Sequence, residues 1–351
     1  MTGRAVAEDL LAEVETVIDR VFQDAGGRLG DLAGFDAVWE EARQGAAGGK
    51  LLRPRLLLAA QGAFAGEPAE SAVHAAAALE LLHLAFLLHD DVIDRDVLRR
   101  GEPNLIARRR DAAQAAGADE AGALRYGDSC AILAGDLLLS AAHRLIAELD
   151  APTAHRRALL AVLGDAIEAA AVGEHADVVL GLRGDADEEA VLRTMEHKTA
   201  RYSFSAPLRM GALLGGADPA AIDTLGFIGT TIGIAFQARD DVLGVFGDPE
   251  RTGKSVLSDL REGKVTLLVA HSRSHASWRE ASALFGDPGL DERGAAVLRT
   301  AIVESGGLAR TEAAISGLVA EARAALLFSA LPAPLIAELE SVIARATERT
   351  R

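Results

Sequence analysis

Residues 73–96 read VHAAAALELLHLAFLLHDDVIDRD, and this segment indicates the architecture of the whole chain. It is apolar on nearly every side, and a helix that is hydrophobic all round belongs in the interior of a protein. The segment then ends in four aspartates within seven positions. Charged side chains seldom lie inside a protein without a partner. The acidic end therefore either turns into solvent or holds a cation.

Composition and periodicity both favour helices. Apolar residues make up 50% of the 351 residues and aromatic residues only 4%, with alanine and leucine dominant, a mixture of good helix formers. Apolar residues recur at helical spacing from residues 10–21 onward. Further helices are predicted over residues 73–96, 128–149, 153–180, 187–214, 220–247, 263–284, 291–303, 307–328 and 332–349.

The breaks between these helices carry turn residues. They are GGK at 48–50, GEP at 66–68, GADP at 216–219, and FGDP at 246–249 and 285–288. The alanine-rich residues 111–124 are predicted to form a surface loop or a short exposed helix. No segment shows the strict alternation of a strand, and no linker is long enough to divide the chain. We therefore predict one all-α domain over residues 1–351.

Charge and cysteine content restrict the partners and the compartment. The net charge of -16 argues against a nucleic-acid partner. The one cysteine, Cys130, excludes an internal disulfide and favours a reducing, cytoplasmic location, although an exported protein with few cysteines would have the same composition. The amino-terminal residues 1–22 have helical periodicity and several acids, which does not fit a signal peptide. Asp, His or Arg interrupts the apolar runs short of the roughly 20 residues that a membrane span needs, so no span is expected.

The acidic end of the first helix suits magnesium. Asp90 and Asp94 are four residues apart and lie on one face of a helix. Magnesium prefers oxygen ligands and is commonly held by one or two carboxylates together with substrate phosphates. A solvated helix end remains the alternative. A calcium loop fits less well, because its sixth and twelfth positions, counted from Asp90, are Arg95 and Gly101 rather than glycine and glutamate.

A second acidic pair and several basic motifs strengthen the cation hypothesis. FQARDDVLGVFGD at 236–248 again ends an apolar helix, with Asp240 and Asp241. Arginine and lysine side chains are the usual ligands of diphosphates. They occur here in turns and short motifs: GGKLLRP at 48–54, RRGEPN at 99–104, HKT at 197–199 and GKSVLSDLREGK at 253–264.

In this order, the motifs resemble those of the trans-isoprenyl diphosphate synthases, the polyprenyl synthetase family. The resemblance extends from GGKLLRP to EGK at 264 and includes ELLHLAFLLHDDVID at 80–94 and AILAGDLLL at 131–139. It implies the isoprenoid synthase fold, an antiparallel helical bundle around a deep central cavity, in a homodimer. It also implies magnesium-dependent head-to-tail transfer, in which isopentenyl diphosphate condenses with an allylic diphosphate.

The resemblance also implies site residues. The candidate catalytic residues are Asp90, Asp94, Lys198 and Asp240, and the three aspartates would bind magnesium, about three ions with substrate present. The matches to the isopentenyl diphosphate site are Lys50, Arg53, His83 and Arg100. The matches to the allylic diphosphate site are Arg99, Lys198, Thr199, Gln237, Lys254 and Lys264. Asp177, in GEHAD at 173–177, matches an aspartate near the metals.

Two residues depart from the family pattern. Gly244 stands where many members carry a third aspartate in the second motif, and Glu174 replaces a common glutamine. Both substitutions bear on the fine geometry of the metals rather than on the reaction.

The reaction explains why no nucleophile or redox cofactor is expected. An allylic carbon–oxygen bond ionises when metals and cationic side chains stabilise the departing diphosphate. The isopentenyl double bond then attacks the carbocation, and the released diphosphate can take up the proton. Water must be excluded, because it would quench the cation.

The first helix is also expected to set product length. Each turn descends about 5.4 Å from Asp90, which places Phe86, Ala85 and Leu82 beneath it. In the family that the motifs resemble, large aromatic residues at these two positions go with short products and small residues with long ones. By that resemblance, a bulky Phe86 beside a small Ala85 implies geranylgeranyl diphosphate, with farnesyl or longer products as alternatives. An ordinary core role for Phe86 is the competing interpretation.

Three other protein classes share some of these sequence features. A class I terpene cyclase also ionises allylic diphosphates, but it has no need of GGKLLRP or of Arg99 and Arg100. A non-catalytic subunit of a heteromeric synthase commonly loses its aspartate motifs, whereas Asp90 and Asp94 are kept here. A helical scaffold would leave the recurrent basic motifs unexplained.

Overall fold

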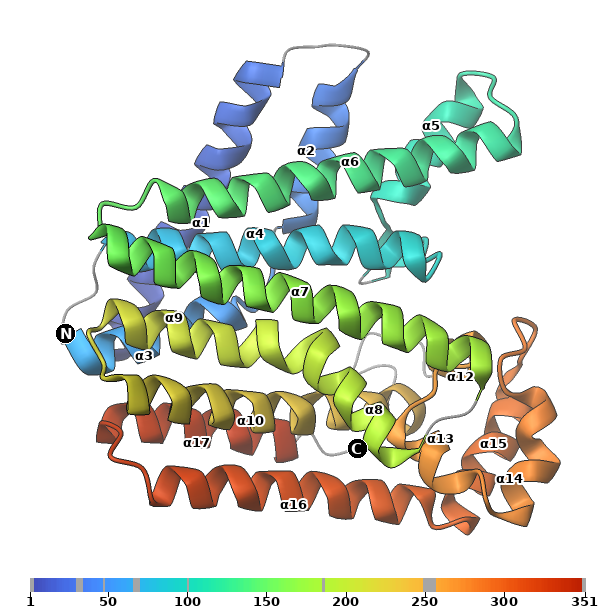
Figure 1. The fold of residues 1–351 in the computed structure, drawn as a ribbon. Coiled ribbons are helices and arrows are strands. Elements are labelled where there is room, and N and C mark those ends of the chain that lie inside the picture. The colour runs from blue at the N-terminus through green and yellow to red at the C-terminus, as the bar shows by residue number, and fades with distance from the viewer. Residues whose placement is uncertain are drawn as a thin grey trace. The chain divides into compact units, whose positions relative to one another are not determined.

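The computed structural model describes residues 3–29, 34–46, 48–65, 70–99, 101–184, 187–248 and 257–348. Within these ranges the chain is helical almost throughout (Figure 1), which confirms the all-α prediction. The chain divides into two compact units, Met1–Ala161 with Met210–Gly216, and Val162–Arg209 with Ala217–Arg351. That they act as one domain stays a prediction.

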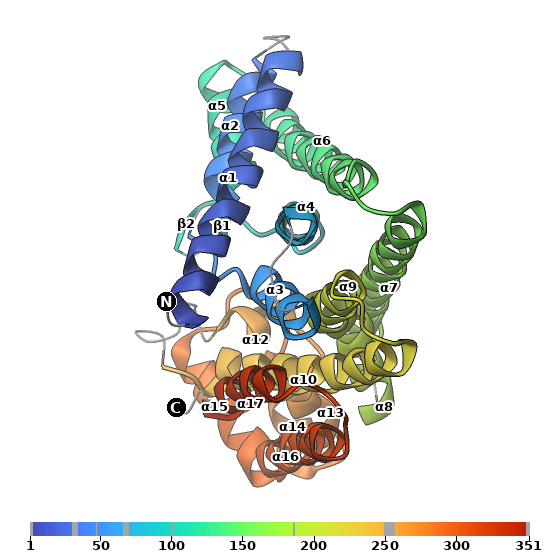
Figure 2. The same ribbon diagram turned by 90° about the vertical axis from the view of Figure 1, so that its left-hand side faces the viewer.

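The first unit is built around α4 (Glu70–Ile93), the helix expected to be central. Figure 2 looks along α4, which packs mainly against α6, α3 and α1 in this unit. Apart from the half-buried Leu87, its alanine and leucine side chains are almost fully buried from Ala72 to Leu88. The other elements are α1 (Gly3–Leu29), α2 (Phe35–Ala46), α3 (Leu52–Ala65), β1 (Leu98–Arg99), β2 (Glu102–Pro103), α5 (Leu105–Ala115), α6 (Glu120–Ala147) and the start of α7 (Thr153–Arg183).

The second unit is built around α10 (Pro219–Phe246), which runs alongside α16 and α17 (Figure 1). Its start follows from local chemistry, because Asp218 accepts a hydrogen bond from Ala221 N at 2.8 Å and Pro219 occupies the first turn. The other elements are α8 (Glu188–Met195), η1 (Glu196–Ser205), α9 (Ala206–Leu214, which ends in the first unit), α12 (Ser258–Glu262), α13 (Leu267–Ser272), α14 (Ala276–Ala281), η2 (Ser282–Leu284), α15 (Glu292–Glu304), α16 (Gly307–Leu327) and α17 (Ala333–Glu348).

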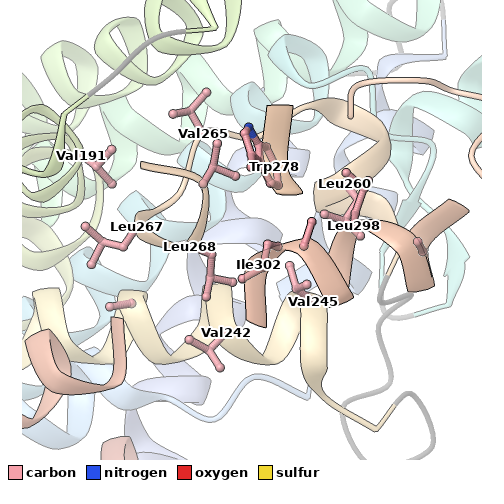
Figure 3. Close-up of a cluster of buried hydrophobic side chains, with 14 of the residues drawn as sticks. Val191, Val242, Val245, Leu260, Val265, Leu267, Leu268, Trp278, Leu298 and Ile302 are labelled. Atoms are coloured by element: carbon pink, nitrogen blue, oxygen red, sulfur yellow. The ribbon is translucent and has the colours of Figure 1, made fainter. Parts of the chain in front are cut away.

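A cluster of aliphatic side chains fills the core of this second unit (Figure 3). Val242 and Val245 of α10 meet Leu260 of α12 and Leu298 and Ile302 of α15. All five are at most 5% exposed. This packing fixes the segment after the second acidic motif against α10.

Three details differ from the sequence prediction. Residues 263–284 do not form one helix. Gly263 adopts a left-handed conformation (φ 70°) that ends α12, α13 covers only Leu267–Ser272, and His275 caps a separate helix, α14. Residues 187–214 are helical, but their middle is the π-helix η1. Two strands of two residues each, β1 and β2, form a minimal antiparallel hairpin where no strand was predicted. The turn GEP at 66–68 lies outside the described residues.

The alanine-rich segment 111–124 is partly a loop. α5 continues to Ala115, Gly117 turns the chain with a φ of 95°, and α6 begins at Glu120 after an Asp119 cap. The expected exposure is correct for most of the segment.

Among the residues that the structure describes, three helices, α4, α6 and α10, are long and apolar enough to cross a membrane by length and composition. Their most apolar windows are 67%, 44% and 50% buried in the structure, respectively. In α4, much of this apolar surface is therefore used in packing. The prediction of no membrane span stays a prediction.

Glycines allow α10 to approach η1 closely, and this contact can be tested. A Cβ added to Gly233 would lie 2.6 Å from the Cα of Ala200. We expect Gly233→Ala to lower the melting temperature, because overpacking against backbone costs about 1–3 kcal/mol. The matched control is Gly317→Ala in α16, where a Cβ meets nothing within 4 Å. There alanine should stabilise the helix by up to about 1 kcal/mol. Equal melting temperatures for the two variants would contradict the close contact.

Candidate functional site

The acidic end of α4 keeps the predicted one-turn spacing. α4 ends at Ile93, but Asp94 N still donates to Asp90 O at 2.8 Å, so the two aspartates remain one helical turn apart. Arg95 then has a positive φ of 59°, which turns the chain away from the helix axis. Asp90 is half-buried and Asp94 is exposed. Both carboxyl groups lie at the end of the apolar helix, as predicted.

Asp91, between them, has a different role that the sequence did not show. It is only 1% exposed and forms an ion pair with the Arg99 guanidinium, whose Nε also donates to Asp91 Oδ2 at 3.3 Å. Burial raises the pKa of Asp91, and the bond to Arg99 opposes this rise. Arg99 was expected to contact the allylic diphosphate. In the structure the Arg99 guanidinium bonds to Asp91 and to the carbonyl oxygen of Leu87, and its contact with substrate stays a prediction.

The motif AILAGDLLL also gains a structural explanation. A Cβ added to Gly135 on α6 would lie 2.2 Å from His89 Nε2, so the glycine leaves room for the imidazole that precedes Asp90. His89 Nε2 lies 3.6 Å from Asp136 Oδ1 and 3.3 Å from the carbonyl oxygen of Ile132. The Gly-Asp pair therefore positions the last turn of α4. In the sequence, the only sign of this contact is that Gly135 and Asp136 interrupt an apolar run.

The residues matched to isopentenyl diphosphate all lie in the first unit. Lys50 is exposed and directly precedes α3, while its carbonyl oxygen accepts a hydrogen bond from Arg55 Nε at 3.2 Å. Arg53 on α3 and His83 on α4 are half-buried, and these two helices pack together. Arg100 lies outside the described residues.

The residues expected to measure the product differ in burial. Leu82 and Ala85 are fully buried, and Phe86 is half-buried. Of these three, only Phe86 presents side-chain surface beyond the packed core of its unit.

In the second unit, Lys198 is held between two carboxylates of α7. Its Nζ lies 2.9 Å from Glu174 Oε2 and 2.7 Å from Asp177 Oδ2. The contact requires Gly173, because a Cβ there would lie 2.1 Å from the backbone nitrogen of Lys198. Lys198 also lies in the π-helix η1, a geometry that is frequent at functional sites. Glu174 stands where a glutamine is common in the family, and it therefore places a second negative charge beside the Lys198 ammonium group.

A chain of hydrogen bonds joins η1 to the second acidic motif. Thr199 Oγ1 donates to Gln237 Oε1 at 3.0 Å, and Gln237 Nε2 donates to Asp241 Oδ1 at 2.9 Å. Lys264 Nζ donates to the same Asp241 oxygen at 3.2 Å. Asp241 is 4% exposed, and burial raises its pKa against the attraction of Lys264. The negative charge of Asp241 in turn holds the pKa of Lys264 well above its usual value.

Both acidic motifs therefore follow one plan. The second aspartate of each pair is buried and bonded to a basic side chain, and the first is half-buried. Asp90 and Asp240 are the two first aspartates. Lys254, a further predicted ligand, lies outside the described residues.

The donor chemistry fits magnesium without a preformed cage. No group of three or more His, Cys, Asp or Glu placed to hold a metal occurs in the part of the chain that the structure describes. Magnesium needs only one or two carboxylates when phosphates and waters complete its shell. Asp90 and Asp94 offer two such carboxylates one turn apart. The Asp91 carboxylate is already bonded to Arg99 and is not one of these candidate ligands.

Comparisons with known proteins agree with this site. The family model described as polyprenyl synthetase matches residues 38–291. A geranylfarnesyl diphosphate synthase of Aeropyrum pernix is 38% identical over 79% of this chain and 82% of its own length. A geranylgeranyl diphosphate synthase of Mycobacterium tuberculosis is 32% identical over 98% of this chain and 94% of its own.

A solved structure shows the same fold over nearly the whole length. It is the geranylgeranyl pyrophosphate synthase of Corynebacterium glutamicum, complexed with isoprenyl diphosphate and magnesium. The TM-score is 0.88 at 30% identity, with 96% of this chain and 98% of that chain covered. The chain therefore belongs to the polyprenyl synthetase family, with the isoprenoid synthase fold, and is a prenyltransferase.

The buried pair of Asp91 and Arg99 predicts a stability effect that is separate from catalysis. Arg99→Met would leave a carboxylate that is almost fully buried without its cation, at a cost of about 3 kcal/mol in unfolding free energy. Urea denaturation measures this loss. The matched control is Arg43→Met, which removes an exposed pair with Asp19 and Glu40 and should lower the stability far less, because water screens exposed ion pairs. Equal losses in both variants would show that the Asp91 pair is not structural.

Proposed function

We propose that this prenyltransferase condenses isopentenyl diphosphate with an allylic diphosphate, head to tail and with magnesium, and that its product is geranylgeranyl diphosphate. The main support is an arrangement that occurs in both acidic motifs. In each, a buried aspartate forms an ion pair with a basic side chain, and the aspartate before it is half-buried. The named relatives support prenyl transfer itself.

Each unit has a distinct task in this proposal. Asp90 and Asp94 would hold magnesium in the first unit, and Asp240 would do so in the second. Magnesium, when bound, supplies Lewis-acid stabilisation of the departing diphosphate. Lys50, Arg53 and His83 would position isopentenyl diphosphate, so that the attack becomes an intramolecular step. About three ions with substrate bound is the number that we propose.

Lys198 would stabilise the negative charge of the leaving group. Its ammonium group is already placed by Glu174 and Asp177, and such preorganised charges need no rearrangement during the reaction. Thr199 and Gln237 form the hydrogen-bond chain that leads to Asp241, so they would orient the same region. The apolar body of α4 would keep water from the carbocation.

Product length is the finer part of the proposal. Phe86 is the half-buried residue one turn below Asp90, and its bulk would stop chain growth there. The relatives include geranylfarnesyl, geranylgeranyl and farnesyl diphosphate synthases, so they support a product in this range without choosing one length. A farnesyl or longer product is therefore the second candidate.

We also propose a homodimer in the cytoplasm. Exposed apolar side chains along α6 support the dimer, among them Leu124 (45%), Ile132 (43%) and Leu133 (52%). The free, buried Cys130 supports a reducing compartment.

The two diphosphate roles can be separated by kinetics. Asp90→Ala should lower turnover by about 10²-fold or more, because metal stabilisation of the leaving group supplies several kcal/mol. Lys50→Ala should chiefly raise the KM for isopentenyl diphosphate. The assay is chain extension of dimethylallyl, geranyl and farnesyl diphosphates with magnesium, before and after chelation by EDTA. Asp111→Ala, an exposed acid on α5, is the control. Turnover that survives EDTA would refute the metal role, and a hydrocarbon formed without isopentenyl diphosphate would indicate a cyclase.

The role of Phe86 can be tested by product analysis. Phe86→Ala should shift the product toward longer chains while extension continues, because the side chain that ends growth is removed. Mass spectrometry of the reaction products measures the shift. Leu87→Ala, at the next position on α4, is half-buried as well but points about 100° away, and it should leave the product length unchanged. The same product distribution from wild type and Phe86→Ala would mean that Phe86 is only a packing residue.

A further inference from the structure

Gly244 occupies a position where a side chain is excluded by another part of the chain. It lies one helical turn after Asp240 on the same face of α10. A Cβ added to Gly244 would lie 2.3 Å from Asp259 Oδ2 and 3.2 Å from Asp259 Cγ. The space beside α10 at this turn is therefore filled by the carboxylate of Asp259, which α12 carries.

The backbone of Asp259 is held firmly in this place. Lys264 N donates to Asp259 O at 3.0 Å across the left-handed Gly263. The next residue, Leu260, is 1% exposed within the core of the second unit, and its carbonyl oxygen accepts a hydrogen bond from Gly286 N at 2.9 Å. The approach of Asp259 to Gly244 thus follows from the packing of α12 on α10.

The charge balance beside Gly244 is negative. Asp241 is bonded to Lys264, whereas the half-buried Asp259 carboxylate forms no hydrogen bond or ion pair within the described residues. The negative charge of Asp259 acts on both members of that pair, raising the pKa of Asp241 and of Lys264. Lys264 therefore balances only part of the negative charge of Asp241 and Asp259, and this excess negative charge would attract a further cation.

We infer that the carboxylate of Asp259 takes the place of the third aspartate that many family members carry at position 244. Glycine is required at this position because it leaves space for the Asp259 carboxylate. Cβ atoms four residues apart on a helix are about 5–6 Å from each other. A carboxylate over Gly244 therefore lies within a span that one magnesium ion can bridge from Asp240, directly or through a bound water, with ligand distances of about 2.1 Å. This inference rests on the proposed function, since it assigns a positioning role at the same metal site.

The competing interpretation is that Gly244 has simply lost a ligand. In that case a methyl group at position 244 would not alter metal binding. In ours, Gly244→Ala displaces the Asp259 carboxylate, which can rotate away at little cost to the fold because it is the end of a short side chain. Metal binding and folding stability should then change in different directions.

The experiment measures magnesium binding without turnover. The melting temperature of the full chain is followed during a Mg²⁺ titration at fixed inorganic pyrophosphate, for wild type, Gly244→Ala, Asp259→Asn and the double variant. We expect each single variant to raise the Mg²⁺ midpoint about tenfold, the range for residues that orient metal ligands. The double variant should be no weaker than Asp259→Asn alone, because both changes remove one interaction. Without Mg²⁺ the melting temperature of Gly244→Ala should be unchanged or higher.

Matched controls isolate the contact. Glu262→Gln removes an acid from the same short helix, and Gly317→Ala adds a methyl group to a helix in open space. Neither should move the Mg²⁺ midpoint. A wild-type midpoint for Gly244→Ala or Asp259→Asn, or additive losses in the double variant, would overturn the inference and leave the proposed function intact. Absence of any Mg²⁺ effect in wild type would overturn the proposed function and the inference with it.

Discussion

A carboxylate buried at the end of an apolar helix needs a cation, and both acidic motifs are organised by this requirement. Asp91 is paired with Arg99 and Asp241 with Lys264. Breaking a buried ion pair is costly because it leaves a desolvated charge. Each pair therefore fixes the rotation of its helix end, and the neighbouring aspartate is left at a defined, half-buried position. The arrangement of the candidate metal ligands Asp90, Asp94 and Asp240 therefore follows from ion pairs whose carboxylates are not among those ligands.

Small residues make these arrangements possible. Gly135 leaves room for His89, and Gly173 lets α7 approach the backbone of Lys198. The scarcity of aromatic residues has the same consequence, since helices with alanine and glycine on their contact faces can pack closely and at fixed register. The π-helix η1 adds a local change of phase, which places Lys198 and Thr199 toward different neighbours, the carboxylates of α7 and Gln237 of α10.

Much of the fold could be read from the sequence, because long amphipathic or fully apolar helices leave a strong periodic signal. The ends of α4 and α10 were predicted to within a few residues, and their acidic motifs with them. The π-helix, the hairpin of β1 and β2 and the break after Gly263 could not be predicted, since they depend on backbone hydrogen bonds and on single residues. The pairing of Arg99 with Asp91 was also missed. A list of basic residues near acidic ones does not show which partner each one takes.

The replacement of glutamine by Glu174 changes the electrostatics of Lys198 in a definite way. With Glu174 and Asp177 both within 3 Å of its Nζ, the lysine is more than neutralised before any ligand arrives. Its net effect on a diphosphate is then weaker than that of a lysine with one acidic partner, because the surrounding carboxylates repel the same anion. Additional cations are needed to offset that repulsion. In the proposed magnesium-dependent reaction, metal binding and diphosphate binding would therefore be strongly coupled in this chain.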